Sequence, residues 1–463
     1  MTLIKSISGI RGTIGGMAGN SLSPLDLVKF SSAFGEWIIN NSKNKRKKIV
    51  IGRDARISGE MANKIVCGSL SALGIDIVDL GFATTPSVEI AVLKLKADGG
   101  IIITASHNPM QWNALKLLNS KGEFISAKDG IELLKLADNA AFNYAEVNNL
   151  GTITGDNSIN SFHISQILEL ELVNKKAIEK AQFKVIIDCV NSVGGLIIPD
   201  LLDSLGVKEV VKLYCEPTGE FPHNPEPLPQ HLTDISKAMI NNNADVGFVV
   251  DPDVDRLAII NEDGSMFGEE YTLVAVADYV LNICRGNTVS NLSSTRALKD
   301  ITEKHGGQYT SAAVGEVNVV EAMKKSNAII GGEGNGGVIY PELHYGRDAL
   351  VGIALFLSHL AITGVKCSEL RAGYPDYAIS KNKIELDPEI EIDKLFYSLK
   401  NKYKQQSINE IDGLKIDFDN EWVHIRKSNT EPIVRIYSES RTMEAAENLS
   451  AKIINDIKKL ISE

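Results

Sequence analysis

The sequence predicts a large α/β protein that ends in a separate α+β domain, and three observations support this fold class. The chain has 463 residues, which is enough for three or four domains with cores of their own. Apolar strand patterns alternate with helical patterns along most of the chain, as is typical of α/β layers around buried sheets. The last part instead carries successive strand patterns and one closing helix.

The first α/β unit contains a strand at residues 48–54 (KIVIGRD) that leads into a loop. Residues 59–74 have apolar side chains at helical spacing, and Gly74 stands where a glycine commonly ends a helix. Residues 75–81 (IDIVDLG) and 99–105 (GGIIITA) are the next predicted strands. This order of elements assigns the segment to one α/β domain.

The same alternation continues through two further units. In the second unit a strand begins at Phe183 and a helix ends at Leu205, with Gly206 as its stop. Its other predicted elements are a strand at 207–214, a helix near 232–242 and a strand at 244–250. The third unit has strands at 257–261, 287–293 and 327–333, and helices near 269–284 and after Thr295.

The end of the chain differs from the three units before it. Strand patterns at 413–418, 421–427 and 432–440 follow one another without a helix between them, which favours antiparallel pairing. An amphipathic helix is predicted from about Thr442. Polar stretches between the patterns give four predicted domains, at residues 1–150, 151–256, 257–370 and 371–463.

Composition excludes several classes of function. The net charge of −11 argues against a general nucleic-acid binder and against binding to anionic membranes. The apolar stretch 349–357 is far too short to span a bilayer, and the N-terminus lacks the apolar core of a signal peptide. The five cysteines are widely spaced, with no C-x-x-C pair, and favour a reducing compartment. We therefore expect a cytoplasmic protein.

The most specific chemical pattern is DPDVDR, which stands between two apolar strand patterns. Asp251, Asp253 and Asp255 occupy every second position, so an extended chain places them on one side and a tight loop lets them converge. Crowded carboxylates repel one another and need a cation, and an oxygen-only ligand set suits Mg²⁺. A solvated acidic turn is the alternative. An EF-hand is excluded because Arg256 stands where that loop requires glycine.

A glycine-rich stretch, GEGNGG at 332–337, formally contains G-x-G-x-x-G. A dinucleotide site is not expected, because Val-Ile-Tyr-Pro follows in place of a helix. A flexible loop could instead present Glu333 and Asn335 to the hydroxyl groups of a sugar. The alternative is an ordinary glycine-rich turn.

A third pattern lies in RKSNTEPIVRIYSES near the C-terminus. Ser428, Asn429 and Thr430 offer hydroxyl, amide and backbone donors, with Arg426 before them and Arg435 on the next strand. Such donors can form a phosphate clamp. A hairpin with surface charges is the alternative.

The strand pattern at 99–105 runs into Ser106-His107-Asn108-Pro109. Ser106 could be a nucleophile, half of a Ser–His pair or part of an ordinary turn. Neighbouring residues of a strand point to opposite faces, which disfavours a direct pair with His107. The sequence has no G-x-S-x-G elbow to support a hydrolase triad.

Together these motifs resemble the four active-site loops of the α-D-phosphohexomutases in their order and separation. The motifs are TASHNP at 104–109, DPDVDR at 251–256, GEGNGG at 332–337 and RKSNTEP at 426–432. SISGIRG at 6–12 is similar to the N-terminal signature of that family. The resemblance spans essentially the whole chain, with one loop per domain. It implies three α/β/α domains with mixed sheets and a C-terminal α+β domain, arranged around a central active-site cleft.

The resemblance also implies roles at the reaction centre. Ser106 matches the serine that carries a phosphoryl group, and its phosphate completes one Mg²⁺ site per enzyme. The matching metal ligands are Asp251, Asp253 and Asp255. Lys116 matches a lysine proposed as general acid/base, and Arg11 and Arg256 line the reaction centre.

Substrate binding is implied for the two remaining loops. Glu333 and Asn335 fall in the sugar-binding loop. The loop that holds the phosphate not being transferred contains Arg426, Ser428, Asn429 and Thr430, and Arg435 is expected to join it.

The implied reaction passes a phosphoryl group from phosphoserine to a hexose monophosphate, through a hexose 1,6-bisphosphate that is both intermediate and activator.

The motifs are most similar to those of microbial phosphoglucosamine mutases, which interconvert glucosamine 6-phosphate and glucosamine 1-phosphate. Asn335, Pro252 and Val254 depart from the usual residues of those loops, so a phosphomannomutase/phosphoglucomutase is the alternative. A Mg²⁺-dependent sugar phosphatase and a non-catalytic sugar-phosphate sensor are further hypotheses. The expected partner is a small sugar phosphate, with no nucleic acid or membrane, and the protein is expected to be a monomer or homodimer.

Overall fold

The computed structural model of the whole chain describes residues 2–6, 9–385, 390–427 and 433–462. Its elements form two compact units. The first consists of residues 1–280 with 335–371, and the second of residues 281–334 with 372–463.

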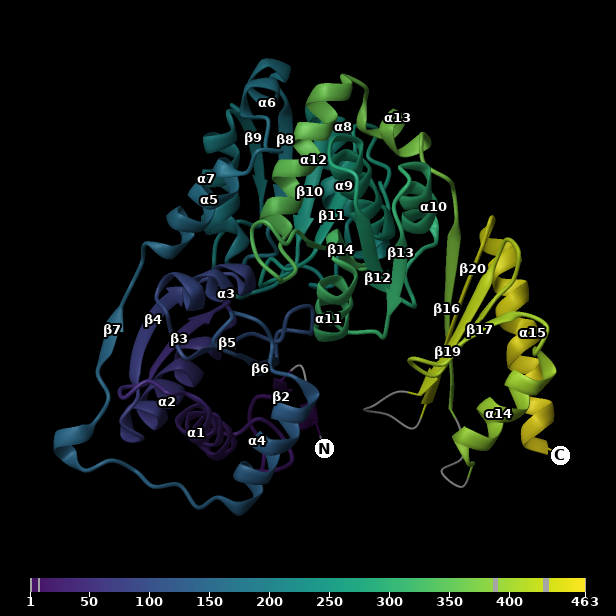
Figure 1. Cartoon of the computed structure of the whole chain (residues 1–463). Helices are drawn as coiled ribbons and strands as arrows, with labels where there is room; N and C mark the ends of the chain where they lie inside the picture. The colour runs from purple at the N-terminus through teal and green to yellow at the C-terminus, as the bar shows by residue number, and fades with distance from the viewer. Residues whose placement is uncertain (1, 7–8, 386–389, 428–432, 463) are drawn as a thin grey trace. The chain divides into compact units, whose positions relative to one another are not determined.

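A seven-stranded mixed sheet forms the N-terminal part of the first unit (Figure 1). Its strands, in spatial order, are β1 (Ile4–Ser6), β2 (Gly9–Thr13), β6 (Trp112–Leu118), β5 (Gly99–Ile103), β3 (Lys48–Arg53), β4 (Asp76–Phe82) and β7 (Ile153–Gly155). β5, β3, β4 and β7 run parallel, whereas β6 and β2 pair antiparallel. The antiparallel end of the sheet carries the strands on which Arg11 and Lys116 lie.

Helices cover both faces of this sheet. One face packs its isoleucines against α1 (Pro24–Asn41), α2 (Gly59–Ala72) and α4 (Ala127–Asn139). On the other face, Gly52 and Gly100 leave room for the valine side chains of α3 (Thr85–Lys94). A parallel sheet buried on both faces needs the nearly continuous apolar strands that the sequence displays.

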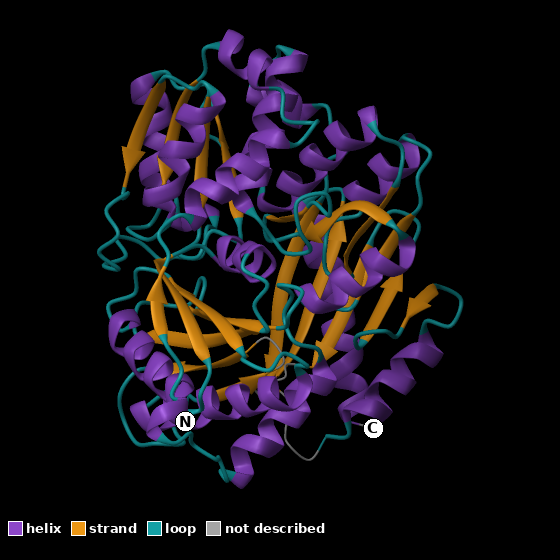
Figure 2. Ribbon diagram, turned by 60° about the vertical axis from the view of Figure 1, so that its left-hand side comes forward, coloured by secondary structure: helices purple, strands orange, loops and turns teal. Residues whose placement is uncertain are grey.

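A four-stranded sheet forms the next part of the first unit (Figure 2). Its strands, in spatial order, are β11 (Leu257–Asn261), β10 (Val246–Val250), β8 (Lys184–Asp188) and β9 (Glu209–Leu213). β10 and β11 form an antiparallel pair, and β8 runs parallel to both β10 and β9. The helices of this part are α5 (Ile159–Glu169), α6 (Lys175–Ala181), α7 (Gly194–Leu205) and α8 (Thr233–Asn242).

The apolar stretch near residue 349 becomes α12 (Ala349–Thr363), which is buried through most of its length. A helix that is apolar all round belongs inside a protein core. Phe356 of α12 meets Phe248 and Phe267 edge to face, with ring centroids 6.1 and 5.2 Å away. The short strand β15 (Gly337–Ile339) precedes this helix, and α13 (Cys367–Ala372) follows it.

The second unit contains parallel and antiparallel strands in separate sheets. Strands β13 (Tyr309–Ala312), β12 (Asn287–Asn291) and β14 (Ala328–Glu333) are parallel neighbours, and α10 (Ala297–Lys304) and α11 (Glu316–Ser326) connect them. Helix α9 (Glu269–Ile283) leads into this part of the chain. The antiparallel sheet has the order β16 (Ala378–Glu385), β20 (Ile433–Ser440), β19 (Trp422–Lys427), β18 (Leu414–Asp417) and β17 (Ser407–Asn409). Figure 1 shows α14 (Ile392–Lys402) and α15 (Met443–Ser462) against one face of this sheet, where their leucines and isoleucines form a core.

These elements confirm the predicted fold class of mixed α/β layers followed by a C-terminal α+β part. The four domain boundaries stay predictions. The sequence analysis missed α1, although Leu27, Phe30 and Phe34 recur on its buried face. Within the described residues, no helix combines the length and the apolar character that crossing a membrane requires.

The contacts of α12 give a stability prediction. Phe356→Ala should lower the free energy of unfolding of the first unit by about 3–5 kcal/mol, because it leaves a cavity between two aromatic rings. Ile362 is 52% exposed on the same helix, so Ile362→Ala should cost less than about 1 kcal/mol. Urea unfolding followed by circular dichroism measures both effects, and equal losses would contradict the assigned core.

Candidate active site

The three predicted aspartates lie in the short loop between the antiparallel strands β10 and β11. The loop is tight rather than extended, because Val254 adopts a left-handed φ of 64° and its N–H donates to the carbonyl of Asp251 at 3.1 Å. Asp251, Asp253 and Asp255 are all fully buried. One carboxylate oxygen of each lies within 4.8 Å of the others. The sequence allowed either an extended chain or a tight loop in which the three carboxylates converge, and the tight loop is correct.

Two cations offset part of this buried negative charge. Lys116 Nζ lies 2.6 Å from Asp253 Oδ2 and 3.1 Å from Asp255 Oδ2. Arg347 Nη2 donates to Asp255 Oδ2 at 2.7 Å. Burial opposes the charge of Lys116, but Asp253 and Asp255 outweigh it and raise the pKa of this ammonium above its ordinary value. Burial also opposes ionisation of Asp255, but Arg347 and Lys116 outweigh it and lower the pKa of that carboxyl.

The remaining carboxylate atoms fit a divalent cation. Among the described residues, the buried atoms Asp253 Oδ1 and Asp255 Oδ1 accept no hydrogen bond. Burial, and then the nearby carboxylates of Asp255 and Asp253, raise the pKa of Asp251 well above its usual range. Unsatisfied oxygens and mutual repulsion are both relieved when a cation binds. Because the donors are all oxygens, a hard ion such as Mg²⁺ suits them.

Ser106 lies beside this loop. Its hydroxyl donates to Asp251 Oδ2 at 2.6 Å, across 145 residues of sequence. Strand β5 ends at Ile103, and Ser106 adopts a left-handed φ of 48°. The expectation that Ser106 and His107 point to opposite faces of a strand is therefore wrong, because the backbone has already turned. The serine nevertheless has an aspartate as its closer partner.

The His107 ring lies at a longer distance from the serine hydroxyl, with 3.4 Å between Oγ and Nδ1. Burial, and then the positive charge of Arg256, lower the pKa of His107 well below its usual value. The imidazole is therefore neutral at physiological pH. A neutral ring at this distance makes a weak hydrogen bond, in contrast to the short bond to Asp251.

Arg11, Lys116 and Arg256 belong to the same unit as Ser106. Arg11 on β2 is paired with Ala114 on β6, so Arg11 and Lys116 share one face of the sheet. Arg256 follows the acidic loop, with its Nε 3.8 Å from Asp255 Oδ1. Both arginines lie near enough to His107 to lower its pKa.

The glycine-rich loop follows β14 and leads into β15 without a helix, so the dinucleotide interpretation stays excluded. In the second unit, Glu333 Oε1 accepts from Asn291 Nδ2 at 2.9 Å and from the N–H of Gly315 at 3.1 Å. In the first unit, Asn335 Oδ1 lies 3.5 Å from Arg347 Nη1. Hydrogen bonds therefore hold both predicted sugar-binding side chains.

The predicted phosphate clamp lies partly outside the described residues, which exclude Ser428, Asn429 and Thr430. Arg426 on β19 and Arg435 on β20 stand directly opposite one another, as predicted for neighbouring strands. Lys383 on β16 is the next partner of Arg435. Because Ile384, Val434 and Ile425 face the core with α14 and α15, these three cations share the other face of the sheet.

Sequence reasoning missed several residues that contact the predicted site. Arg347 and Lys383 lie outside the recognised motifs, and their positions follow only from strand pairing and side-chain contacts. Thr85 donates its hydroxyl to Asp253 Oδ2 from the start of α3. Arg56 binds the loop that carries Ser106. The one available signal was the position of Arg56, three residues after the end of an apolar strand.

A second buried group joins three segments of the first unit. Asp348 Oδ2 lies 2.9 Å from His163 Nε2 and 3.4 Å from His344 Nε2, and His344 Nδ1 lies 3.1 Å from Glu89 Oε2. Burial alone would lower the pKa of His344, but Asp348 and Glu89 raise it to about 10. The group is thus an internal ion-pair network.

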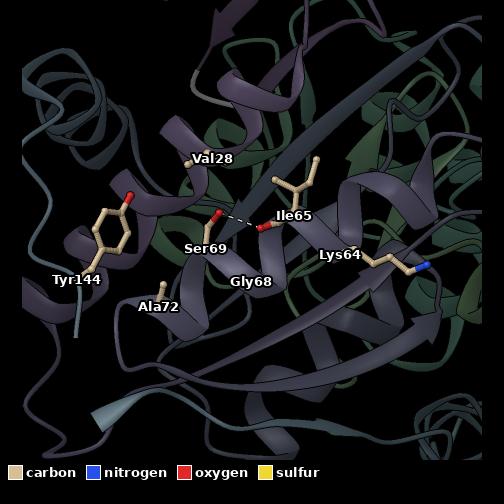
Figure 3. A pocket seen from close by; sticks show the side chains of 7 residues that line it. All are labelled: Val28, Lys64, Ile65, Gly68, Ser69, Ala72 and Tyr144. Carbon is tan, nitrogen blue, oxygen red and sulfur yellow. Dashed lines mark hydrogen bonds between the residues drawn. The ribbon is translucent and has the colours of Figure 1, made fainter. Parts of the chain in front are cut away.

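A shallow hollow on the first unit lies between α1 and α2, with Tyr144 at its rim (Figure 3). Its lining is mostly apolar, and Lys64 is the charged residue among the seven that Figure 3 labels. Lys64 pairs with Glu60 at 2.6 Å. The hollow shares no residue with the predicted site.

The chain matches four sequence models of one family, described as phosphoglucomutase/phosphomannomutase. The α/β/α domains I, II and III match residues 3–143, 161–264 and 268–377, and the C-terminal domain matches residues 386–456.

Individual relatives align over nearly the whole chain. A Thermococcus kodakarensis protein named phosphoglucomutase/phosphomannomutase is 36% identical, covering 94% of this chain and 95% of its own. A Sulfurisphaera tokodaii protein named phosphoglucosamine/phosphogalactosamine mutase is 32% identical, covering 98% of each chain. A Burkholderia thailandensis crystal structure of a phosphoglucomutase/phosphomannomutase family protein superposes with a TM-score of 0.84 at 26% identity, covering 98% of each chain. The chain therefore belongs to the phosphoglucomutase/phosphomannomutase family of α-D-phosphohexomutases, and it is an isomerase of that family.

Proposed function

We propose that this protein is a phosphoglucosamine mutase, which interconverts glucosamine 6-phosphate and glucosamine 1-phosphate through a phosphoserine at Ser106. The proposal rests on the 2.6 Å hydrogen bond from the Ser106 hydroxyl to Asp251, which lies in the buried acidic loop. A phosphoryl group on this oxygen would stand directly beside the carboxylates that suit Mg²⁺.

Ser106 is the proposed phosphoryl donor and acceptor. In the first half-reaction a sugar hydroxyl oxygen bonds to phosphorus as the bond to Ser106 Oγ breaks, which leaves a hexosamine 1,6-bisphosphate. After the bisphosphate turns around, its other phosphate returns to Ser106 Oγ and the product leaves. Lys116, which lies 2.6 Å from Asp253 Oδ2, is proposed to move the proton between the serine and sugar oxygens.

The charges around Ser106 support phosphoryl transfer, which depends chiefly on positioning and charge neutralisation. Asp251, Asp253 and Asp255 would hold one Mg²⁺, which would neutralise charge on the transferred group. Arg256 and Arg11 are proposed to bind the equatorial oxygens of that group.

Three cations of the second unit support phosphate binding. Lys383, Arg435 and Arg426 are directly adjacent across three strands. Like charges in directly opposite positions destabilise a sheet, and a bound anion would offset that cost. We propose that they hold the phosphate that is not transferred, together with Ser428, Asn429 and Thr430, while Glu333 and Asn335 bind the sugar hydroxyls.

The names of two relatives support different choices of the sugar phosphate substrate. The Sulfurisphaera tokodaii relative is named for phosphoglucosamine and phosphogalactosamine, and it aligns with 98% of this chain. The more similar Thermococcus kodakarensis relative is named phosphoglucomutase/phosphomannomutase. This second name favours a phosphomannomutase/phosphoglucomutase as the alternative function.

The proposal also includes the cellular compartment, the binding partner and the oligomeric state of the enzyme. All five cysteines are free thiols, which is consistent with a reducing cytoplasm. The proposed partner is a small sugar phosphate, with hexose 1,6-bisphosphate as activator. A monomer or a homodimer is expected.

Removing the Ser106 hydroxyl tests the proposed mechanism. Ser106→Ala should lower kcat for hexose phosphate isomerisation by about three orders of magnitude or more, because no acceptor for the phosphoryl group remains. Coupled initial-rate assays measure the loss, and circular dichroism checks the fold. Ser120→Ala, in an exposed turn after β6, is the matched control. Near wild-type turnover by Ser106→Ala would overturn the phosphoserine mechanism.

Removing one carboxylate charge tests the metal site. Asp253→Asn should raise the Mg²⁺ concentration needed for half-maximal activity by about 10- to 100-fold or more, because a ligand oxygen and its charge are lost. Asp263→Asn provides a control in the exposed turn after β11. An unchanged Mg²⁺ dependence in Asp253→Asn would remove this loop from the site.

Initial rates on three sugar phosphates test the preferred substrate. With a catalytic amount of the matching hexose bisphosphate, kcat/KM for glucosamine 1-phosphate should exceed the values for glucose 1-phosphate and mannose 1-phosphate by about tenfold or more. A higher value for glucose or mannose would establish the alternative function. Stoichiometric release of inorganic phosphate would instead indicate a phosphatase.

A further inference from the structure

Arg56 is a charged side chain that is only 1% exposed. All five N–H groups of its guanidinium have acceptors. Its Nε donates to Asp54 Oδ2 at 3.0 Å. Its Nη atoms donate, over 2.5 to 3.0 Å, to the carbonyl oxygens of Ser106, Asn108, Pro109 and Trp112. Three of these carbonyls belong to the connection from β5 to β6 that carries Ser106, and the fourth belongs to Trp112, the first residue of β6.

The backbone of Ser106 is held from both sides by one small network. Its carbonyl accepts from Arg56 Nη2, and its N–H donates to Thr104 Oγ1 at 2.9 Å. The Thr104 hydroxyl donates in turn to Asp54 Oδ2 at 2.6 Å. Both supports therefore meet at the carboxylate of Asp54. They keep Ser106 at a φ of 48°, a conformation that residues other than glycine seldom adopt.

The same segment is also joined to the acidic loop. The N–H of Ala55 donates to Ser192 Oγ at 3.3 Å, and the Ser192 hydroxyl donates to the carbonyl of Pro252 at 2.7 Å. Pro252 lies between the first two aspartates of the acidic loop. Residues 54–56 therefore hold the serine loop on one side and the acidic loop on the other.

We propose that Arg56 is a positioning residue for phosphoryl transfer, an inference that rests on the proposed function. Its guanidinium sets the place of Ser106 Oγ relative to the acidic loop, and Arg56 itself does not touch substrate. A planar fork of five donors is the one side chain that can bind four carbonyls and a carboxylate together. Displacing a reacting oxygen by about 1 Å can cost about 100-fold in rate.

Two substitutions test this role in the full-length enzyme, and the second has a conservative comparison. Arg56→Lys keeps the charge and loses the fork, and it should lower kcat about 100-fold while KM for the sugar phosphate changes less than about threefold. Thr104→Val removes the acceptor for the Ser106 N–H and should also lower kcat, whereas Thr104→Ser should retain activity. Arg46→Lys is the matched control, because Arg46 uses its guanidinium fork on Asp76 and on the carbonyl of Leu150, outside residues 54–56 and the serine loop.

Chemical rescue separates positioning from general stability. Arg56→Ala leaves a space lined by the same acceptors, so guanidinium chloride at non-denaturing concentration should restore part of kcat, and ammonium chloride should not. The rate of Ser106 phosphorylation by hexose 1,6-bisphosphate, followed by intact-protein mass, should fall and recover in parallel. If Arg56→Ala does not fold, Arg56→Lys and Thr104→Val decide the question.

The outcomes distinguish this inference from the proposed function. A wild-type protein without mutase activity would overturn both. An active wild type, with kcat unchanged in Arg56→Lys and Thr104→Val, would overturn the positioning role alone. A rise in KM without a fall in kcat would also overturn it, because it would place Arg56 in substrate binding.

Discussion

Three aspartates are buried together in one short loop, and this concentration of negative charge constrains the rest of the site. Carboxylates at such distances repel one another strongly inside a protein. Lys116 and Arg347 reach the loop from different segments and offset part of the repulsion. Two carboxylate oxygens still accept no hydrogen bond among the described residues. The loop is therefore suited to bind a cation, which would relieve both the repulsion and the unsatisfied oxygens.

The Ser106 hydroxyl and the acidic loop come from segments that are far apart in sequence, so their distance depends on rigid supports. Arg56 and Asp54 hold the backbone around Ser106, and Ser192 joins their segment to the acidic loop. These supports are buried polar groups with satisfied hydrogen bonds, which specify one geometry more sharply than apolar packing does. The strained φ of Ser106 persists because several bonds determine it together.

Much of the fold and the main chemistry could be predicted from the sequence, because both depend on local patterns. Apolar runs and helical apolar spacing predicted the central strands of the three α/β parts and six helices, including α7 with its left-handed Gly206, whereas α1, α3 and α12 were among the helices missed. Convergence of Asp251, Asp253 and Asp255 was one of the two geometries that their place between two strand patterns allowed. By contrast, the extended geometry assumed at Ser106 was wrong, since a two-residue turn leaves no periodic signal. Arg347 was missed for a related reason: its partner Asp255 lies 92 residues away.

The sequence by itself determined the order of elements, the fold class and the residue types that mark each loop, because hydrophobic periodicity and motif spacing are written along the chain. Only the tertiary structure decided that the Ser106 hydroxyl meets Asp251, that Arg347 meets Asp255, and that Lys383 joins Arg435 and Arg426. Such contacts depend on which strands become neighbours and on the register between them. Both are settled by burial of apolar faces across the whole domain and not by any short stretch of sequence.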